Sequence, residues 1–130
     1  MNDLFEKAKE VLPHSYAHYS KFKVAAAIRL QDGKIITGVN VENASFGLTN
    51  CAERTALFTA FTQGYRKEDI TEMVVTTEKD YIISPCGACR QVMSELMTPD
   101  ALIHMVTKSG KVTTVKNKEL LPLAFQESDL

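Results

Sequence analysis

Two short stretches, Cys51-Ala52-Glu53-Arg54 and Pro85-Cys86-Gly87-Ala88-Cys89, contain all three cysteines of the chain. The C-x-x-C spacing of the second stretch lets two thiolates on one turn of the chain reach a single metal ion. Cys51 supplies a third thiolate, and no histidine has a metal-type spacing to the cysteines. Zinc sites with three protein ligands keep a coordination position open for water, as catalysis requires. The two stretches therefore predict one catalytic zinc ion per chain, bound by Cys51, Cys86 and Cys89.

The residues around these stretches predict an α/β fold in which both stretches begin helices. Apolar side chains at helical spacing predict three helices, with Asn2 or Asp3 capping the first. Runs of β-prone residues predict five strands, and Asp32-Gly33 has the sequence of a hairpin turn. The helices are predicted over residues 3–12, 51–63 and 87–97, and the strands over residues 23–30, 34–41, 72–77, 101–107 and 111–115.

This order of elements predicts one domain, residues 1–130, with a three-layer α-β-α architecture and a mixed five-stranded sheet. Ligands of such sheets bind beyond the strand ends, where helix N-termini point, so both cysteine stretches are expected to meet at one site. His18 and His104 are expected to be surface or strand residues without a partner. The side chains expected to fill the core from helical positions are Phe5, Phe58, Phe61, Met93 and Met97.

Composition excludes several classes of function. The chain has 45% hydrophobic and 24% charged residues, which are ordinary globular values and argue against disorder. A net charge of −1, with acids and bases interspersed, argues against a nucleic-acid partner. The first residues lack a long apolar run, so we expect no signal peptide, no membrane span and a cytoplasmic location. An odd number of cysteines in a reducing compartment favours metal binding or catalysis over disulfides.

The charges of the two stretches fit a catalytic metal. Three thiolates and Zn²⁺ together carry one net negative charge, which weakens the ion as a Lewis acid toward water. Two helix N-termini, each equivalent to about +0.5 charge, offset this. Arg54 is predicted to donate hydrogen bonds to the thiolates. Glu53 is predicted to lie near the metal without binding it, where its carboxylate can take a proton from metal-bound water and pass it on.

Other interpretations of the cysteines remain open at this point. A lone C-x-x-C motif also occurs in redox proteins and in structural metal sites. A thiol-redox protein requires Cys86 and Cys89 to be free and to form a disulfide that competes with zinc. A non-catalytic, zinc-stabilised binding module would keep its function in a Glu53→Gln variant. The combined pattern C-x-E…P-C-x-x-C is much rarer, and it is the three-cysteine form of the pattern found in zinc nucleobase deaminases.

The chain resembles the small, homotetrameric class of cytidine deaminases in five collinear segments. These segments are Tyr19–Phe22, Asn40–Ala44, Asn50–Ala56, Ser84–Val92 and Leu120–Pro122. The resemblance implies a cytidine deaminase-like fold, a homotetramer with shared active sites, and hydrolytic deamination of cytidine and 2′-deoxycytidine in pyrimidine salvage. It implies that zinc-bound hydroxide adds to C4 of cytosine. Glu53 would shuttle a proton to N3 and then to the departing amino group, giving uridine or 2′-deoxyuridine and ammonia.

The resemblance also implies which residues bind the nucleoside. Asn40 and Glu42 would hydrogen-bond the ribose, and Phe22 would pack against the pyrimidine ring. Backbone groups near Ala52 and Ser84 would read the edge of the base. Asn40 and Glu42 are two residues apart, so both face one way along an extended strand end, and an amide with a carboxylate suits vicinal hydroxyls. The residues implied to serve a neighbouring subunit's site are Ala44, Phe46 and Phe125.

Three positions depart from the usual sequence of this class. Ala25 replaces a frequent glycine and is expected to shift its strand or to narrow the pocket. His18 stands where proline is often found, and Phe46 stands where tyrosine is frequent. These positions bear on substrate preference rather than on the reaction. A sister deaminase of another aminopyrimidine nucleoside, such as blasticidin S, is the alternative, although the Asn40 and Glu42 pair favours a free ribose.

Overall fold

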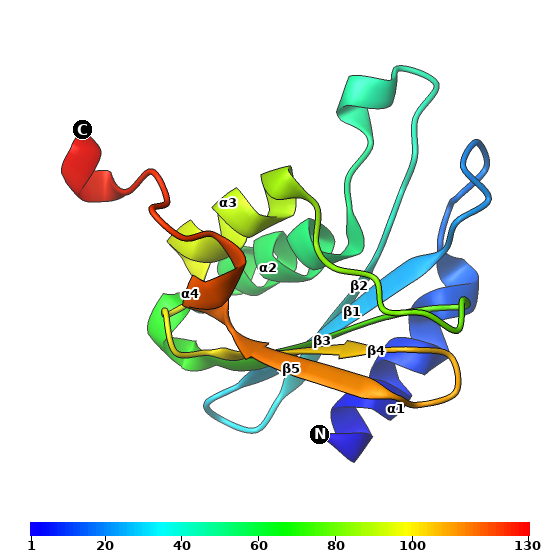
Figure 1. Ribbon diagram of the computed structural model, residues 1–130, viewed down its shortest axis with the longest axis horizontal. Coiled ribbons are helices and arrows are strands. Elements are labelled where there is room, and N and C mark those ends of the chain that lie inside the picture. Colours follow the sequence, from blue (N-terminus) through cyan, green and yellow to red (C-terminus); the bar gives the residue numbers. More distant parts are fainter.

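The computed structural model describes residues 1–130, and its centre is a mixed five-stranded sheet with the strand order β2-β1-β3-β4-β5 (Figure 1). Adjacent strands pair antiparallel except β3 and β4, which run parallel. The mixed five-stranded sheet predicted from the sequence is therefore confirmed. The strands are β1 (Val24–Leu30), β2 (Ile35–Val39), β3 (Ile70–Thr77), β4 (Leu102–Val106) and β5 (Val112–Lys116).

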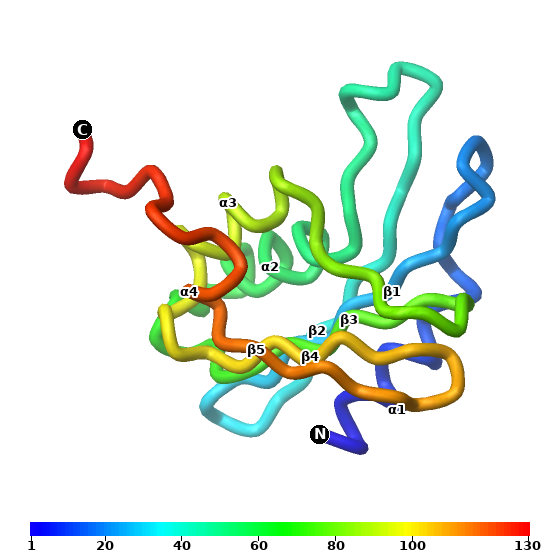
Figure 2. The backbone as a smooth tube through the Cα atoms, in the orientation of Figure 1, coloured from blue at the N-terminus to red at the C-terminus, as the bar shows by residue number.

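Helices cover both faces of the sheet, as the order of elements predicted (Figure 1). Helix α1 (Asn2–Val11) lies on one face, and α2 (Ala52–Thr62) and α3 (Gly87–Leu96) lie side by side on the other. A short helix, α4 (Asn117–Leu120), follows β5. The chain path in Figure 2 shows that the segment between β2 and α2 and the C-terminal tail both project from this body. A bilayer span needs about 20 apolar residues, and no helix of the structure meets that requirement.

Two apolar clusters hold the three layers together. The larger cluster, of 17 buried residues, lies between the sheet and the α2–α3 layer. The smaller cluster joins Leu4 and Ala8 of α1 to Ala25, Ala27 and Val74 of the sheet. Because Ala25 packs against α1, its methyl group lies on the face opposite the cysteine-bearing helices. The expectation that Ala25 narrows the pocket is therefore wrong, and its small side chain instead fits beneath α1.

Two other expectations about side chains are corrected by the packing. Phe58 is 45% exposed, because it lies on the outer side of α2, whereas Met93 and Met97 are buried as expected. Helix α1 begins after Met1 without a side-chain cap, so the expected cap at Asn2 or Asp3 is wrong. The carboxylate of Asp3 instead accepts a hydrogen bond from the backbone N–H of Leu4 at 2.9 Å.

His104 is buried and paired, contrary to the expectation that it lacks a partner. Its Nε2 lies 2.7 Å from Oε2 of Glu72, and its Nδ1 lies 2.8 Å from Oγ1 of Thr114. Arg29 Nε donates to Oε1 of Glu72 at 2.7 Å, and Arg29 Nη2 donates to Asp3 at 2.6 Å. We call these five residues the polar row. It runs from α1 through β1, β3 and β4 to β5. Burial opposes ionisation of Glu72, but hydrogen bonds from Arg29 and His104 outweigh it and hold the pKa of this carboxyl below its ordinary value.

A glycine in β2 lets α2 lie directly on the sheet. A methyl group at Gly38 would lie 2.5 Å from the backbone nitrogen of Ala56 and 2.6 Å from the backbone oxygen of Ala52. Strand and helix backbones therefore touch at the first turns of α2. This contact fixes the height of the helix that carries Glu53 above the sheet.

We expect Gly38→Ala to lower the free energy of unfolding by about 1–3 kcal/mol, because the added methyl forces α2 away from β2. Urea denaturation of the zinc-loaded protein measures the change. Gly47→Ala is the matched control, since a methyl there meets no atom within 4 Å. Equal stability of the Gly38→Ala and Gly47→Ala proteins would contradict the contact.

We expect Glu72→Gln to lower the free energy of unfolding by about 1–2 kcal/mol at pH 7, through loss of charged hydrogen bonds. The folded-state pKa of Glu72 is depressed below 4.5, so this stabilisation is complete above that pH and is lost as the pH falls through the folded-state value. The difference between wild type and variant should shrink as the pH falls below 4.5 and through the lower folded-state pKa of Glu72. Urea midpoints at each pH measure it, with exposed Glu68→Gln as the control. A pH-independent difference would refute the role of the charge.

Candidate active site

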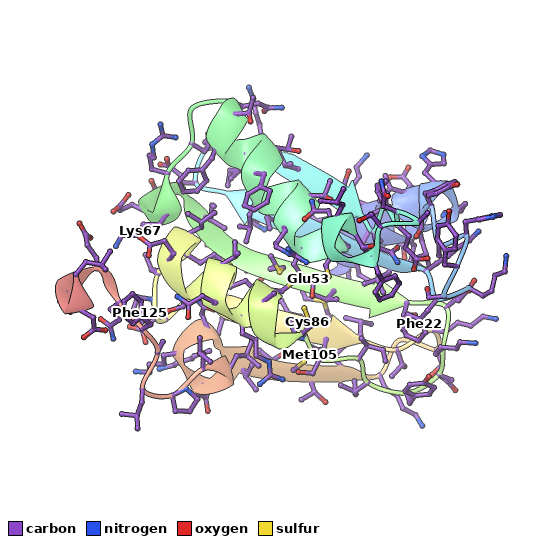
Figure 3. All side chains as sticks on the ribbon, turned by 90° about the horizontal axis from the view of Figure 1, so that it is seen from above. Phe22, Glu53, Lys67, Cys86, Met105 and Phe125 are labelled. Atoms are coloured by element: carbon purple, nitrogen blue, oxygen red, sulfur yellow. The ribbon has the colours of Figure 1, made fainter.

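Both cysteine stretches lie at helix N-termini, as the sequence predicted. Cys51 is the N-cap of α2, and Cys86 is the N-cap of α3. Each cap has an extended backbone, and its carbonyl accepts the first helical hydrogen bond, from Thr55 N–H at 3.1 Å and from Arg90 N–H at 2.9 Å. Figure 3 shows Glu53 and Cys86 facing the space between the two helices. The positive ends of both helices therefore point at one place.

The three thiol groups meet at this place. The sulfur atoms of Cys51, Cys86 and Cys89 all lie within 4.8 Å of one another, and those of Cys51 and Cys86 are 3.8 Å apart. Tetrahedral zinc with Zn–S bonds of about 2.3 Å separates its sulfur ligands by about 3.8 Å. A disulfide instead requires a separation of about 2.05 Å. The donor set thus fits one zinc ion, and it is the one group of this kind in the structure.

Positive charge supports the thiolate form of Cys51. Arg54 Nη2 donates to Sγ of Cys51 at 3.3 Å. Interaction with the Cys89 thiol, and then with Arg54, lowers the pKa of Cys51 to about 5 despite partial burial. The same interaction with Cys51, together with burial, raises the pKa of Cys89. Arg54 Nε is buried without a hydrogen-bond partner, so the bond from Nη2 to Cys51 is the contact that joins this guanidinium to the thiol group.

Glu53 is the buried carboxylate of the site. It is only 4% exposed, and no other side chain donates a hydrogen bond to it. Burial raises the pKa of Glu53 to about 7, with the nearby Cys51 charge contributing in the same direction. A carboxyl group with a pKa near neutrality accepts and releases a proton with similar ease. The arrangement therefore has the chemistry of a proton shuttle next to a metal.

Asn40 and Glu42 lie at the end of β2 and are both buried, whereas Val41 between them is exposed. They face the same way, as their spacing predicted. The segment that contains them is joined to the first cysteine stretch, because Val41 and Asn50 exchange two backbone hydrogen bonds of 2.9 and 3.0 Å. Their side chains already bond to the segment that carries Phe22: Asn40 Nδ2 donates to the Phe22 carbonyl at 2.8 Å. Figure 3 shows Phe22 on the opposite side of Glu53 and Cys86 from Phe125.

The remaining predicted site residues fall into two groups. Ala52 is fully buried in the first turn of α2, beside Cys51. Ala44 is exposed, and Phe46 and Phe125 are 68% and 58% exposed. Phe46 belongs to the projecting segment between β2 and α2, and Phe125 lies at the opposite end of the molecule from Phe22 (Figure 3). The structure of one chain does not bring these two phenylalanines to the thiol group.

Arg90 is a site residue to which the sequence reasoning gave no role. Its Nε donates to the Pro85 carbonyl at 2.7 Å, its Nη1 donates to the Leu120 carbonyl at 2.9 Å, and its Nη2 bonds to the Ser84 hydroxyl. Arg90 thereby fixes the turn that precedes Cys86. Its only sequence signal was its place directly after Cys89, which did not indicate its partners.

Comparison with known proteins agrees with this geometry. A family model described as the cytidine and deoxycytidylate deaminase zinc-binding region matches residues 1–105. A cytidine deaminase of Halalkalibacterium halodurans is 43% identical over 127 residues, covering 98% of this chain and 95% of the relative. A blasticidin-S deaminase of Bacillus cereus is 32% identical over 129 residues, covering 95% of this chain and 90% of the relative. The crystal structure of a cytidine deaminase from Burkholderia pseudomallei superposes with a TM-score of 0.92 and 48% identity, covering 95% of this chain and 98% of the other. The chain belongs to the cytidine and deoxycytidylate deaminase zinc-binding family.

Proposed function

We propose that this protein is a zinc-dependent enzyme that hydrolyses cytidine and 2′-deoxycytidine to uridine and 2′-deoxyuridine, releasing ammonia, in pyrimidine salvage. The observation that carries the proposal is the position of Glu53, a buried carboxylate beside three converging thiols at two helix N-termini. A structural zinc site has four protein ligands and needs no such carboxylate. The combination instead fits proton transfer next to an open metal position.

The proposed ligands of the ion are Cys51, Cys86 and Cys89, and zinc bound there supplies the Lewis acidity that lowers the pKa of water toward about 7. Arg54 balances the charge of the thiolates from the side of Cys51. Glu53 would take one proton from the attacking water and deliver it to ring N3. It would then take the second proton of that water and deliver it to the departing amino group, so that one water supplies both protons. Burial of this carboxylate keeps bulk water from competing for the proton.

The nucleoside is proposed to bind between the helix starts and the end of β2. Phe22 would pack on the pyrimidine ring, and the free backbone N–H groups at the start of α2, near Ala52, would face the base. Asn40 has one amide hydrogen left after its bond to the Phe22 carbonyl, and this hydrogen can serve a sugar hydroxyl. Glu42 offers a carboxylate oxygen to the same sugar.

We further propose a cytoplasmic homotetramer with shared active sites. Phe46, Leu48 and Phe125 are all more than half exposed and lie on the two segments that project from the body. Large apolar side chains on projecting segments are well suited to contact another copy of the chain. In that arrangement Ala44, Phe46 and Phe125 would complete the site of a neighbouring subunit, and sedimentation in solution tests the assembly.

Two rival functions are less well supported. Deamination of blasticidin S is the alternative substrate class, represented by a relative of lower identity than the cytidine deaminase described above. A thiol-redox function of Cys86 and Cys89 is disfavoured, because the sulfur of Cys51 lies within 4.8 Å of both in an arrangement suited to one metal ion. The deciding experiment follows ammonia release by zinc-loaded protein with cytidine, 2′-deoxycytidine, cytosine, CMP and blasticidin S. We expect turnover of the first two compounds. If neither cytidine nor 2′-deoxycytidine is turned over by protein with one zinc per chain, the proposal is refuted.

We expect Glu53→Gln to keep its zinc and to lose at least about 10²–10⁴-fold in kcat, because the amide cannot carry the proton. Steady-state kinetics with cytidine and metal analysis of the same sample measure both quantities. Exposed Glu68→Gln is the matched control and should retain wild-type kinetics. Retained activity in Glu53→Gln would mean that another group moves the proton.

Cys86→Ala is expected to lose most of its bound zinc, because only two thiolates remain. Metal analysis after gel filtration measures the zinc content, and activity should fall in parallel. His18→Gln serves as the control, since its exposed imidazole lies outside the thiol group and the variant should keep its zinc. A Cys86→Ala protein with full zinc content would disprove the ligand assignment.

A further inference from the structure

Residues 15–23, which connect the first helical region to β1 and carry Phe22, contain no helix or strand of their own. Backbone hydrogen bonds join Tyr16 to Asn40 and Glu42, and the side chains of Asn40 and Glu42 bind the rest of the segment. Asn40 Oδ1 accepts hydrogen bonds from the Ser15 hydroxyl and from Val24 N–H, while its Nδ2 donates to the Phe22 carbonyl. Asn40 thus binds this segment at both of its ends.

Glu42 binds the middle of the same segment. Its Oε1 accepts the backbone N–H groups of Tyr19 and Ser20, each at 2.9 Å, and its Oε2 accepts the Ser20 hydroxyl. The hydrogen bond from Ser20 keeps the pKa of this carboxyl below its ordinary value, so the group is ionised at neutral pH. A carboxylate with three donors and 6% exposure is a structural anchor, whatever else it binds.

Ser20 connects this anchor to Phe22. Its hydroxyl donates to Glu42 and at the same time accepts the backbone N–H of Phe22 at 3.0 Å. Lys21 between them has a φ of +60°, a left-handed conformation that is costly for a residue with a side chain. Such a conformation persists only where the residues on both sides are held, as Ser20 and Phe22 are here. The turn at Lys21 sets the direction in which Phe22 leaves the backbone.

We propose that Ser20 and Glu42 form a latch that positions Phe22, so that the carboxylate assigned to the sugar also controls the side chain assigned to the ring. Ser20 is a positioning residue, because it acts through Glu42 and through the backbone of Phe22. The identities of sugar and ring rest on the proposed function. If Glu42 served only as a sugar ligand, its substitution would not change the affinity for a nucleoside that lacks hydroxyls at the 2′ and 3′ positions of the sugar. The latch predicts that the affinity for such a nucleoside falls as well.

The test compares cytidine with 2′,3′-dideoxycytidine, measured as a competitor of cytidine, in zinc-loaded wild type, Ser20→Ala, Ser20→Thr and Glu42→Gln. We expect the affinity for the dideoxy compound to fall about 5- to 20-fold in Ser20→Ala and about tenfold or more in Glu42→Gln. Ser20→Thr keeps the hydroxyl and should restore most of the affinity. The effects of Ser20→Ala and Glu42→Gln should not add in the double variant, because both open one latch. Ser109→Ala, an exposed serine in the β4–β5 turn, is the matched control.

Amide hydrogen exchange of the same zinc-loaded proteins tests the latch in the absence of substrate. Exchange at the amides of Tyr19, Ser20 and Phe22 should rise about tenfold or more in Ser20→Ala and Glu42→Gln and stay at the wild-type level in Ser20→Thr and Ser109→Ala. Lys21→Val tests the positioning of Phe22 while leaving Ser20 and Glu42 unchanged. Because a β-branched residue disfavours the left-handed conformation, this variant should bind dideoxycytidine more weakly.

Two results would overturn the inference. One is a Glu42→Gln penalty that is confined to cytidine and absent for the dideoxy compound. The other is unchanged amide exchange in both latch variants. A wild-type protein that neither binds nor deaminates cytidine would refute the proposed function instead, and the exchange measurement would still decide whether the latch exists.

Discussion

Three thiol sulfurs lie within 4.8 Å of one another, and as thiolates they place like charges close together. Two unit charges at about 4 Å repel by about 4 kcal/mol even at an effective dielectric constant near 20. The fold offsets this repulsion by directing two helix N-termini and Arg54 at the same place. The sheet makes that possible, because it holds α2 and α3 side by side, and the absence of a side chain at Gly38 lets α2 lie against β2.

The sequence was sufficient for features that depend on local pattern. The cysteine stretches predicted the starts of α2 and α3, and β-prone runs predicted five strands in a mixed sheet. Features that depend on distant neighbours were missed. His104 is bonded to Glu72, which lies 32 residues away in the sequence and on another strand. No spacing rule predicts such a pair. Phe58 was assigned to the core because helical spacing identifies a side of a helix without showing which side meets the sheet.

The region proposed to bind the nucleoside also shows what a sequence pattern leaves open. The spacing of Asn40 and Glu42 correctly indicated that both face one way, but it could not show what lies on that side. The segment around Phe22 fills that space and bonds to both side chains. The roles proposed for Phe46 and Phe125 would depend on surfaces of other subunits, which neither the sequence pattern nor one folded chain contains.

The polar row has a consequence for how the chain avoids misfolding. Arg29 lies directly opposite Glu72, and His104 lies directly opposite Thr114, in the cross-strand pairs of the sheet. If a strand slipped by one residue, every side chain on it would turn to the other face. Arg29 or Glu72 would then enter the apolar layer beneath α2 and α3 without a partner, at a cost of several kcal/mol. The row therefore disfavours mispaired sheets, and it favours a single alignment of β1, β3, β4 and β5.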